Sequence, residues 1–435
     1  MPGAKGRSFG FLKGIFRYDF TEIAGLDNLF EPKEILEKSQ SEMAADIGAE
    51  KVLYTVNGSS SGVLTLLSLF RGKKVLFARD FHLSAAHAIE LFDITPVFVY
   101  PETPVISSVV NKAAVKTALE QNPDIAAIYI TYPNYYGFCA DLSGIVKLAH
   151  QKRIPVVVDA AHSACFPYSE FLPASPAESG ADAWVVSTHK TLPAMNQSAY
   201  VAVGKKSRLS AENIKEALNH FVTTSPSYPI MASIDFAKDY MAKKGKRRIE
   251  KLFYAIVKYS KKIDELYGFT VVKQVDKGEP KDVLKWAIDY RASGLSAADV
   301  QKALHKRRIY AEAVDPHYIL FLLSPALHRK ALKKAYRALK KMEPTGNPRE
   351  MKPTYALEKC EWGAPASQET VWADLSACEG KIAAKPVAIY PPGVPAVLKG
   401  QILTRELISG IQRAKAEGLS VVGMKDGLIK VYADK

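Results

Sequence analysis

Two ionisable side chains each follow an apolar segment near the middle of the chain. Lys190 comes shortly after the apolar run at residues 183–186, and Asp159 ends the apolar run at residues 154–158. Earlier in the chain, residues 57–62 form the turn Asn-Gly-Ser-Ser-Ser-Gly. A lysine amine, a carboxylate and a hydroxyl-rich turn together favour a site for pyridoxal phosphate (PLP). In such a site the lysine forms an imine, the acid holds the ring nitrogen and the turn binds the phosphate.

This chemistry requires each group in a particular state. Lys190 must be a neutral amine to attack an aldehyde, and burial near other cations lowers a lysine pKa enough to supply one. The carboxylate of Asp159 would pair with the protonated ring nitrogen, so that the ring draws electrons from Cα of a substrate. Taken singly, Lys190 could be a surface lysine and Asp159 a helix cap.

The phosphate would be bound by hydroxyl groups and backbone amides. A helix is predicted from about Gly62, and the free N–H groups and positive dipole at its start suit an anion. A serine-rich helix cap is the alternative interpretation of the same turn. The candidate hydroxyls are those of Ser59, Ser60, Ser61 and Ser187.

Three histidines lie near these positions in the sequence. His82 follows another apolar run and could stack on the cofactor ring, and His162 lies three residues after Asp159. His189, next to Lys190, could position the substrate carboxylate or return a proton to Cα. Each of the three could instead be an ordinary packing residue.

Apolar runs alternate with helix-like stretches between residues 51 and 203. This alternation predicts an α/β fold with a mostly parallel seven-stranded sheet that is covered on both faces. Ligands of such sheets bind outside the carboxyl ends of the strands, where Ser59, Asp159 and Lys190 are expected. The predicted strands are residues 52–56, 74–78, 95–100, 126–131, 154–159, 183–187 and 199–203, and the predicted helices are residues 31–48, 62–70, 84–92, 111–121 and 142–151.

The length of 435 residues predicts two or three domains. An N-terminal arm (residues 1–30) would precede a cofactor-binding large domain (31–255), a smaller α/β domain (256–345) and a C-terminal domain (346–435). Within these units we expect long basic helices over residues 232–266, strands at 286–290 and 318–323, a helix from 296, a linker at 343–353 and a helix over 404–417.

Composition excludes several classes of protein. No uncharged apolar run is long enough to span a bilayer, and the N-terminus has no apolar leader, so we expect no membrane partner and a cytoplasmic location. The four cysteines are scattered without a Cys-x-x-Cys pair, which favours neither a disulfide framework nor a metal site.

The chain is basic, with a net charge of +14. The excess is concentrated in residues 201–345, which contain 30 Lys and Arg against 15 Asp and Glu. A solvated positive face explains it most simply, and nucleic acid is an unlikely partner because no nucleic-acid motif accompanies the charge. A cationic substrate would need local carboxylates to overcome this field.

With these residues in view, the chain resembles the short-form (group III) PLP-dependent ornithine/lysine/arginine decarboxylases, which have the aspartate-aminotransferase fold (fold type I). The resemblance covers nearly the whole chain. Its most specific blocks are Ser-Thr-His-Lys-Thr-Leu-Pro-Ala at residues 187–194 and Tyr-Pro-Pro-Gly at residues 390–393.

The resemblance implies a role for each candidate residue. Lys190 would carry the cofactor, Asp159 would bind its ring nitrogen, His82 would stack on one face, Ala161 would pack on the other and His162 would lie near the phenolic oxygen. It also implies a homodimer with its sites at the subunit interface, and a smaller α/β domain after the large one. The implied phosphate ligands are Ser59, Ser60, Ser61 and Ser187.

The chain departs from the pattern of this family at five positions. Three polar or ionisable residues are replaced by apolar ones, one histidine by cysteine and one carboxylate by an amide, so cofactor binding is expected to be intact while recognition of a cationic side chain is less secure. The departures are Ala4, Phe30, Ala160, Cys165 and Gln401.

The sequence therefore favours a PLP-dependent α-decarboxylase of arginine, lysine or ornithine, which would release CO₂ and the corresponding amine. Two alternatives stay open. One is another fold-type-I reaction, such as transamination or β-elimination, on a non-basic amino acid. The other is a non-catalytic relative that acts through its basic face.

Overall fold

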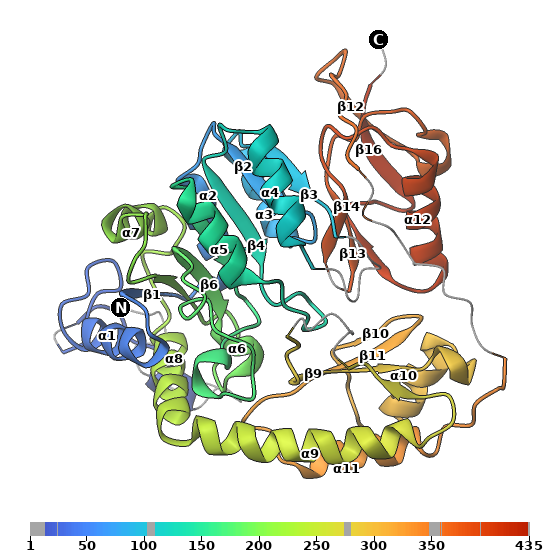
Figure 1. Ribbon diagram of the computed structural model, residues 1–435, viewed down its shortest axis with the longest axis horizontal. Coiled ribbons are helices and arrows are strands. Elements are labelled where there is room, and N and C mark those ends of the chain that lie inside the picture. Colours follow the sequence, from blue (N-terminus) through green and yellow to red (C-terminus); the bar gives the residue numbers. More distant parts are fainter. Residues whose placement is uncertain are drawn as a thin grey trace.

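The largest element of the computed structural model, which describes residues 14–23, 25–101, 109–273, 280–347, 357, 359–391 and 393–433, is a seven-stranded sheet (Figure 1). Its strand order is β1-β7-β6-β5-β4-β2-β3. β7 is antiparallel to both neighbours, and the other pairs are parallel. The mostly parallel seven-stranded sheet predicted from the sequence is confirmed. The strands are β1 (Lys51–Thr55), β2 (Lys74–Ala78), β3 (Thr95–Val99), β4 (Ala127–Thr131), β5 (Val156–Asp159), β6 (Ala183–Ser187) and β7 (Ala199–Val203).

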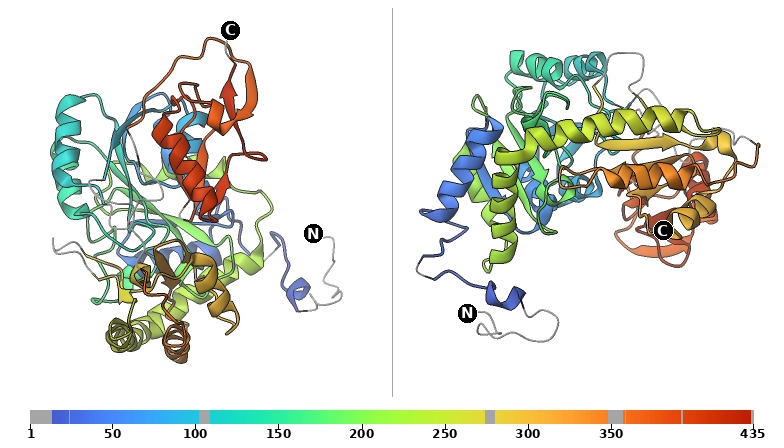
Figure 2. Two further views of the ribbon diagram at one scale, coloured as in Figure 1. Left: turned by 90° about the vertical axis from the view of Figure 1, so that its right-hand side faces the viewer. Right: turned by 90° about the horizontal axis from the view of Figure 1, so that it is seen from below.

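The central strands are apolar on both faces because helices cover both. In β5, Val156 and Val158 join one hydrophobic core and Val157 joins the other, as the alternation of side chains along a strand requires. The two helical layers flank the sheet in Figure 2. One layer contains α1 (Ile35–Ile47), α4 (Lys112–Gln121) and α5 (Leu142–Gln151), and the other contains α2 (Gly58–Ser68), α3 (Leu83–Leu91) and α7 (Ala211–Asn219).

A second, four-stranded sheet lies beside the first, in the order β10-β11-β9-β8. The long helix α9 (Lys246–Asp264) follows α8 (Tyr228–Tyr240) through one π-helical turn at Met241–Gly245 and runs along the lower edge of the molecule, with α11 beside it (Figure 1). The remaining elements are β8 (Thr270–Val271), β9 (Lys285–Asp289), α10 (Ala297–His305), β10 (Ala313–Val314), β11 (Tyr318–Leu322) and α11 (Lys330–Leu339).

The C-terminal region forms two small sheets with one helix, and Figure 1 shows it beside β3 and α3. The buried Arg79 helps to join it to the large sheet: Nη1 donates to the carbonyl oxygen of Pro395 at 2.7 Å and Nη2 to that of Ala396 at 3.3 Å. The elements are β12 (Thr370–Asp374), β13 (Val387–Tyr390), β14 (Val394–Val397), α12 (Arg405–Ala416), β15 (Ser420–Val422) and β16 (Leu428–Tyr432). Short 3-10 turns lie at Ile15–Arg17, Phe166–Tyr168, Arg291–Ser293 and Leu375–Ala377.

Two helix starts differ from the sequence-based prediction. The first helix begins at Ile35 rather than at residue 31, because the carboxylate of Asp27 accepts the backbone N–H groups of Lys33, Glu34 and Leu36 and holds that stretch as a turn. The second helix, α2, begins at Gly58 rather than near Gly62. The serine run therefore lies inside the first turn of α2.

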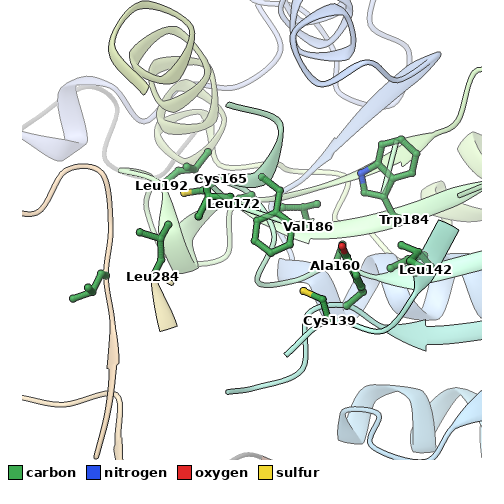
Figure 3. Close-up of a cluster of buried hydrophobic side chains, with 14 of the residues drawn as sticks. Cys139, Leu142, Ala160, Cys165, Leu172, Trp184, Val186, Leu192 and Leu284 are labelled. Carbon is green, nitrogen blue, oxygen red and sulfur yellow. The ribbon is translucent and has the colours of Figure 1, made fainter. Parts of the chain in front are cut away.

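Other expectations concern the cysteines, membrane-spanning helices and residues outside the described ranges. The four cysteines are free thiols, and Cys139 and Cys165 lie in the hydrophobic cluster of Figure 3. Among the residues that the structure describes, no helix is both long and apolar enough to cross a bilayer. The start of the chain, including Ala4, and residues 348–353 of the predicted linker lie outside the described residues.

Candidate active site

A cavity of about 260 Å³ opens at the carboxyl edge of the large sheet. It lies where β1, β2, β4, β5 and β6 end, which is the place that an open α/β sheet offers to ligands. Glu312, which directly precedes β10, and Tyr390 and Val394 of the C-terminal region complete its wall. The lining residues are Ser59, Asp80, His82, Ser84, Thr131, Pro133, Asn134, Tyr135, Tyr136, Asp159, Ala161, His162, Lys190, Glu312, Tyr390 and Val394.

Lys190 enters this cavity from a single helical turn, α6 (Thr188–Thr191), directly after β6. Its Nζ lies 3.1 Å from Nε2 of His162. Burial lowers the pKa of Lys190 below its ordinary value, although the carboxylates of Asp159 and Glu312 act in the opposite direction. A lowered pKa increases the fraction of neutral amine, the state that attacks a carbonyl carbon.

Asp159 is the last residue of β5 and is only 4% exposed. Its Oδ1 accepts the backbone N–H of Ala161 at 3.1 Å, and the hydroxyl of Tyr129 donates to its Oδ2 at 3.3 Å. Burial raises the pKa of Tyr129 well above its usual range, so this phenol stays protonated and remains a donor. The carboxylate is thus held in place at the cavity wall.

The serines occupy different positions at the start of α2. Ser59 lines the cavity and accepts a hydrogen bond from the hydroxyl of Ser187 at 2.7 Å. Ser60 is exposed, and the hydroxyl of Ser61 donates to the carbonyl oxygen of Gly58 at 2.8 Å. Ser59 therefore reaches the cavity directly, whereas Ser60, Ser61 and Ser187 do not line it. The hydroxyl of Ser187 holds that of Ser59 through their hydrogen bond.

Of the remaining predicted residues, His82 and Ala161 line the cavity and His189 does not. His82 caps α3, where its Nδ1 accepts the N–H of Ser84 at 3.2 Å, and burial lowers its pKa, which favours a neutral ring with the proton on Nε2. His82 and Ala161 both line the cavity. His189 does not; its Nδ1 lies 2.8 Å from the carbonyl oxygen of Ser198.

The structure adds site residues that the sequence analysis missed. Asp80 follows β2, and burial raises its pKa to about 7. Glu312 and Tyr135 also line the cavity. Lys285 lies behind His162 and is fully buried, with Nζ 2.6 Å from Nδ1 of His162. One signal for Lys285 was present in the sequence, namely a lysine inside an apolar run at residues 283–288.

Four of the five positions where the chain departs from the family pattern lie among the described residues, and none of them lines this cavity. Ala160 and Cys165 belong to the hydrophobic cluster drawn in Figure 3. Gln401 is buried and accepts the backbone N–H of Leu398 at 3.0 Å through Oε1. Phe30 is half-buried, and none of these four residues lines the cavity. These four substitutions therefore alter no side chain that lines the cavity of this chain.

Comparison with known proteins decides the family. The model of the Orn/Lys/Arg decarboxylase major domain matches residues 5–288. The chain belongs to the Orn/Lys/Arg decarboxylase family. This membership confirms the family and the enzyme class predicted from the sequence, an amino-acid carboxy-lyase.

Relatives within the family span nearly the whole chain. The uncharacterized protein YaaO of Bacillus subtilis is 30% identical over 439 residues, which cover 96% of this chain and 90% of that protein. An arginine decarboxylase of the same organism is 28% identical over 429 residues, covering 94% of this chain and 87% of that protein.

Solved structures show the same fold. The constitutive lysine decarboxylase of Escherichia coli superimposes with a TM-score of 0.79 at 20% sequence identity, covering 97% of this chain and 76% of that one. The lysine decarboxylase LdcF of Francisella novicida gives a TM-score of 0.80 at 18% identity, covering 97% and 75%. The α/β fold-type-I class predicted from the sequence is confirmed.

Proposed function

We propose that the chain is a PLP-dependent α-decarboxylase of a basic amino acid, arginine, lysine or ornithine. The observation that carries the proposal is the meeting of Lys190, Asp159 and Ser59 in one cavity, although they come from the ends of three strands. These groups fit the cofactor: an amine of lowered pKa, a fixed carboxylate, and a hydroxyl at the start of a helix.

Three residues would hold the cofactor, each through a different interaction. Lys190 would bind it covalently, Asp159 would pair with the ring nitrogen, and Ser59 would bind the phosphate together with backbone N–H groups in the first turn of α2. His82 and Ala161 would pack on the two faces of the ring. PLP, when bound, supplies an acceptor for the electrons left at Cα after a bond to it breaks.

The chain's own residues would then control the proton that replaces CO₂ at Cα. Lys190 lines the cavity and His189 does not, which favours Lys190, in its ammonium form at this later stage of the reaction, as the proton donor. The hydrogen bond of His189 to the carbonyl of Ser198 supports a structural role for that ring. His162, whose pKa is lowered well below its usual range by burial and by two lysines, would act as a neutral ring beside the amine.

The carboxylate of Glu312 favours a basic substrate. Glu312 lines the cavity and comes from the loop before β10 of the second sheet, whereas the proposed cofactor ligands follow strands of the large sheet. The hydroxyl of Tyr135 donates to Glu312 Oε1 at 3.4 Å. A carboxylate there would pair with the cationic end of arginine, lysine or ornithine and offset the positive charge of the chain.

We also propose a homodimer. A second, largely apolar hollow of about 640 Å³ is lined by the N-terminal arm, α1 and α8, and Tyr18, Phe20 and Ile35 leave large apolar surfaces exposed around it. An apolar face of this kind favours association. We expect Ile35→Asp to shift the protein towards monomer in sedimentation, and Leu91→Asp, at an equally exposed leucine on α3 outside the hollow, to leave the dimer intact.

The decisive experiment incubates PLP-loaded protein separately with each common amino acid and follows products by mass spectrometry. The proposal predicts CO₂ and one primary amine, agmatine, cadaverine or putrescine, from a basic amino acid. A keto acid product would contradict decarboxylation and favour transamination instead. Lys190→Ala should give neither amine nor covalently held cofactor.

A further inference from the structure

His162 lies between two lysine amines, and this is the unusual feature of the site. Its Nε2 is 3.1 Å from Nζ of Lys190, and its Nδ1 is 2.6 Å from Nζ of Lys285. Burial and both lysines lower the pKa of His162 well below its usual range, so the ring is neutral and carries one proton. One ring nitrogen is therefore a donor and the other is an acceptor.

This arrangement limits the charges that the two lysines can have. The ring nitrogen that carries the proton must donate to its lysine, and an ammonium group cannot accept because it has no lone pair. At least one of the two lysines is consequently a neutral amine. Which lysine is neutral depends on the ring nitrogen that bears the proton.

The contacts of Lys285 identify it as the donor. Its Nζ also donates to the carbonyl oxygen of Tyr135 at 3.0 Å and lies 5.2 Å from the centroid of that ring. Burial lowers its pKa to about 7. The carboxylate of Asp282, the carbonyl oxygen of Tyr135 and the face of its ring all favour the charged form of Lys285. A charged Lys285 can only donate, so its contact with Nδ1 leaves the ring proton on Nε2, directed at Lys190.

The fold holds Lys285 in this position through a close approach of two chain segments. Gly137 has a φ of +95°, and a Cβ there would lie 2.8 Å from Cβ of Lys285 and 3.0 Å from the carbonyl oxygen of Asp282. The backbone N–H of Asp282 donates to Gly137 O at 2.7 Å. The start of β9 is thus fixed against the loop after β4, which leaves Lys285 beside His162.

We propose that Lys285 is a positioning residue that acts through His162 to keep the amine of Lys190 uncharged. Lys285 donates to Nδ1, the ring proton stays on Nε2, and Nε2–H donates to the lone pair of Lys190. The proposal deepens the proposed function, because a neutral Lys190 is the form able to capture a carbonyl cofactor. The carboxylates of Asp159 and Glu312 act in the opposite sense on Lys190, and Asp282 does so on Lys285.

The test measures the protonation of Lys190 itself in full-length protein freed of PLP. Pulse acetylation with acetic anhydride across a pH series, read by mass spectrometry of the peptide that contains Lys190, gives the apparent pKa of its amine. We expect Lys285→Met to raise this pKa by at least one unit, so that labelling at pH 8 falls about tenfold. His162→Phe, which leaves Lys285 in place, should produce the same rise.

A double-mutant cycle separates the hydrogen-bonded route from simple charge repulsion, which would also raise the pKa of Lys190 when Lys285 is removed. In a His162→Phe background, Lys285→Met should have no further effect. Lys281→Met is the matched control, because Lys281 lies in the same segment but contacts the carbonyl oxygens of Asp282 and Lys285; it should leave labelling unchanged.

Two results would overturn the proposal. One is an unchanged or lowered apparent pKa of Lys190 in both single variants. The other is a rise in Lys285→Met that persists at full size when His162 is phenylalanine, which would assign the effect to repulsion. Because the assay contains neither cofactor nor substrate, its failure leaves the decarboxylase proposal standing, and a failed search for amine products leaves this proposal testable.

Discussion

Replacement of Asp80 by asparagine should remove a specific pH dependence from the stability of the cofactor-free protein. Asp80 lines the cavity, and its Oδ1 is a buried atom without a hydrogen-bond partner among the described residues. Burial, reinforced by the carboxylate of Asp159, raises the pKa of Asp80 from an ordinary value of 3.8 to about 7. The folded protein therefore holds a proton that the unfolded chain has already lost over this range.

The sign and size of the effect follow from linkage. Between pH 3.8 and about 7 the folded state binds more protons at Asp80 than the unfolded state, so stability falls as pH rises through this window and stays low above it. A shift of about three units at 1.36 kcal/mol each sets a ceiling of roughly 4 kcal/mol. An experiment between pH 5 and pH 8 covers about two of these units, and the Asp80 side chain is not wholly enclosed, so we expect a change of about 2 kcal/mol.

Urea unfolding of wild type and Asp80→Asn at pH 5 and pH 8, followed by the fluorescence of the buried Trp184, provides the assay. Any fixed cost of placing an amide there cancels when the two pH values are compared for each protein. The free energy of unfolding of wild type should fall relative to that of the variant between pH 5 and pH 8. An equal pH response in both proteins would refute the assignment of a raised pKa to Asp80.

Three further predictions concern packing and specificity. A Cβ on Gly62 would lie 2.5 Å from Cγ2 of Val185, so Gly62→Ala should displace α2, cost about 1–3 kcal/mol of stability in thermal denaturation and weaken PLP retention in a cofactor titration. Tyr136→Phe removes the hydroxyl that donates to the buried carboxylate of Asp315 and should cost about 1–3 kcal/mol in urea unfolding. Glu312→Gln should raise KM for the basic substrate about tenfold, equivalent to about 1.4 kcal/mol, with a smaller change in kcat in steady-state assays; an unchanged KM would remove Glu312 from substrate recognition.

The sequence predicted the parts of the site that depend on local pattern. Asp159 and Lys190 each follow an apolar run, and the runs form β5 and β6 of one sheet, so the sequence pattern is enough to predict their meeting at its carboxyl edge. The sequence predicts the start of α2 four residues too late, because serine and glycine serve equally well as a cap before a helix and as its first turn.

The parts that the sequence left hidden depend on tertiary contacts. Lys285 belongs to another sheet, 95 positions along the chain from Lys190, and no local pattern reports that its amine meets His162. The sequence pattern predicts no helix at α11, because its buried Leu332 and Leu339 are outnumbered by lysine and arginine. The division into an arm and three domains stays a prediction.

The central claim is that Lys190 holds the cofactor, and borohydride reduction of the PLP-loaded protein tests it most directly. Reduction makes the bond between a lysine and a carbonyl cofactor stable to digestion, so the modified peptide can be sequenced by mass spectrometry. We expect the cofactor mass on Lys190 alone. Its appearance on Lys285 or on a surface lysine, with Lys190 unmodified, would contradict the account.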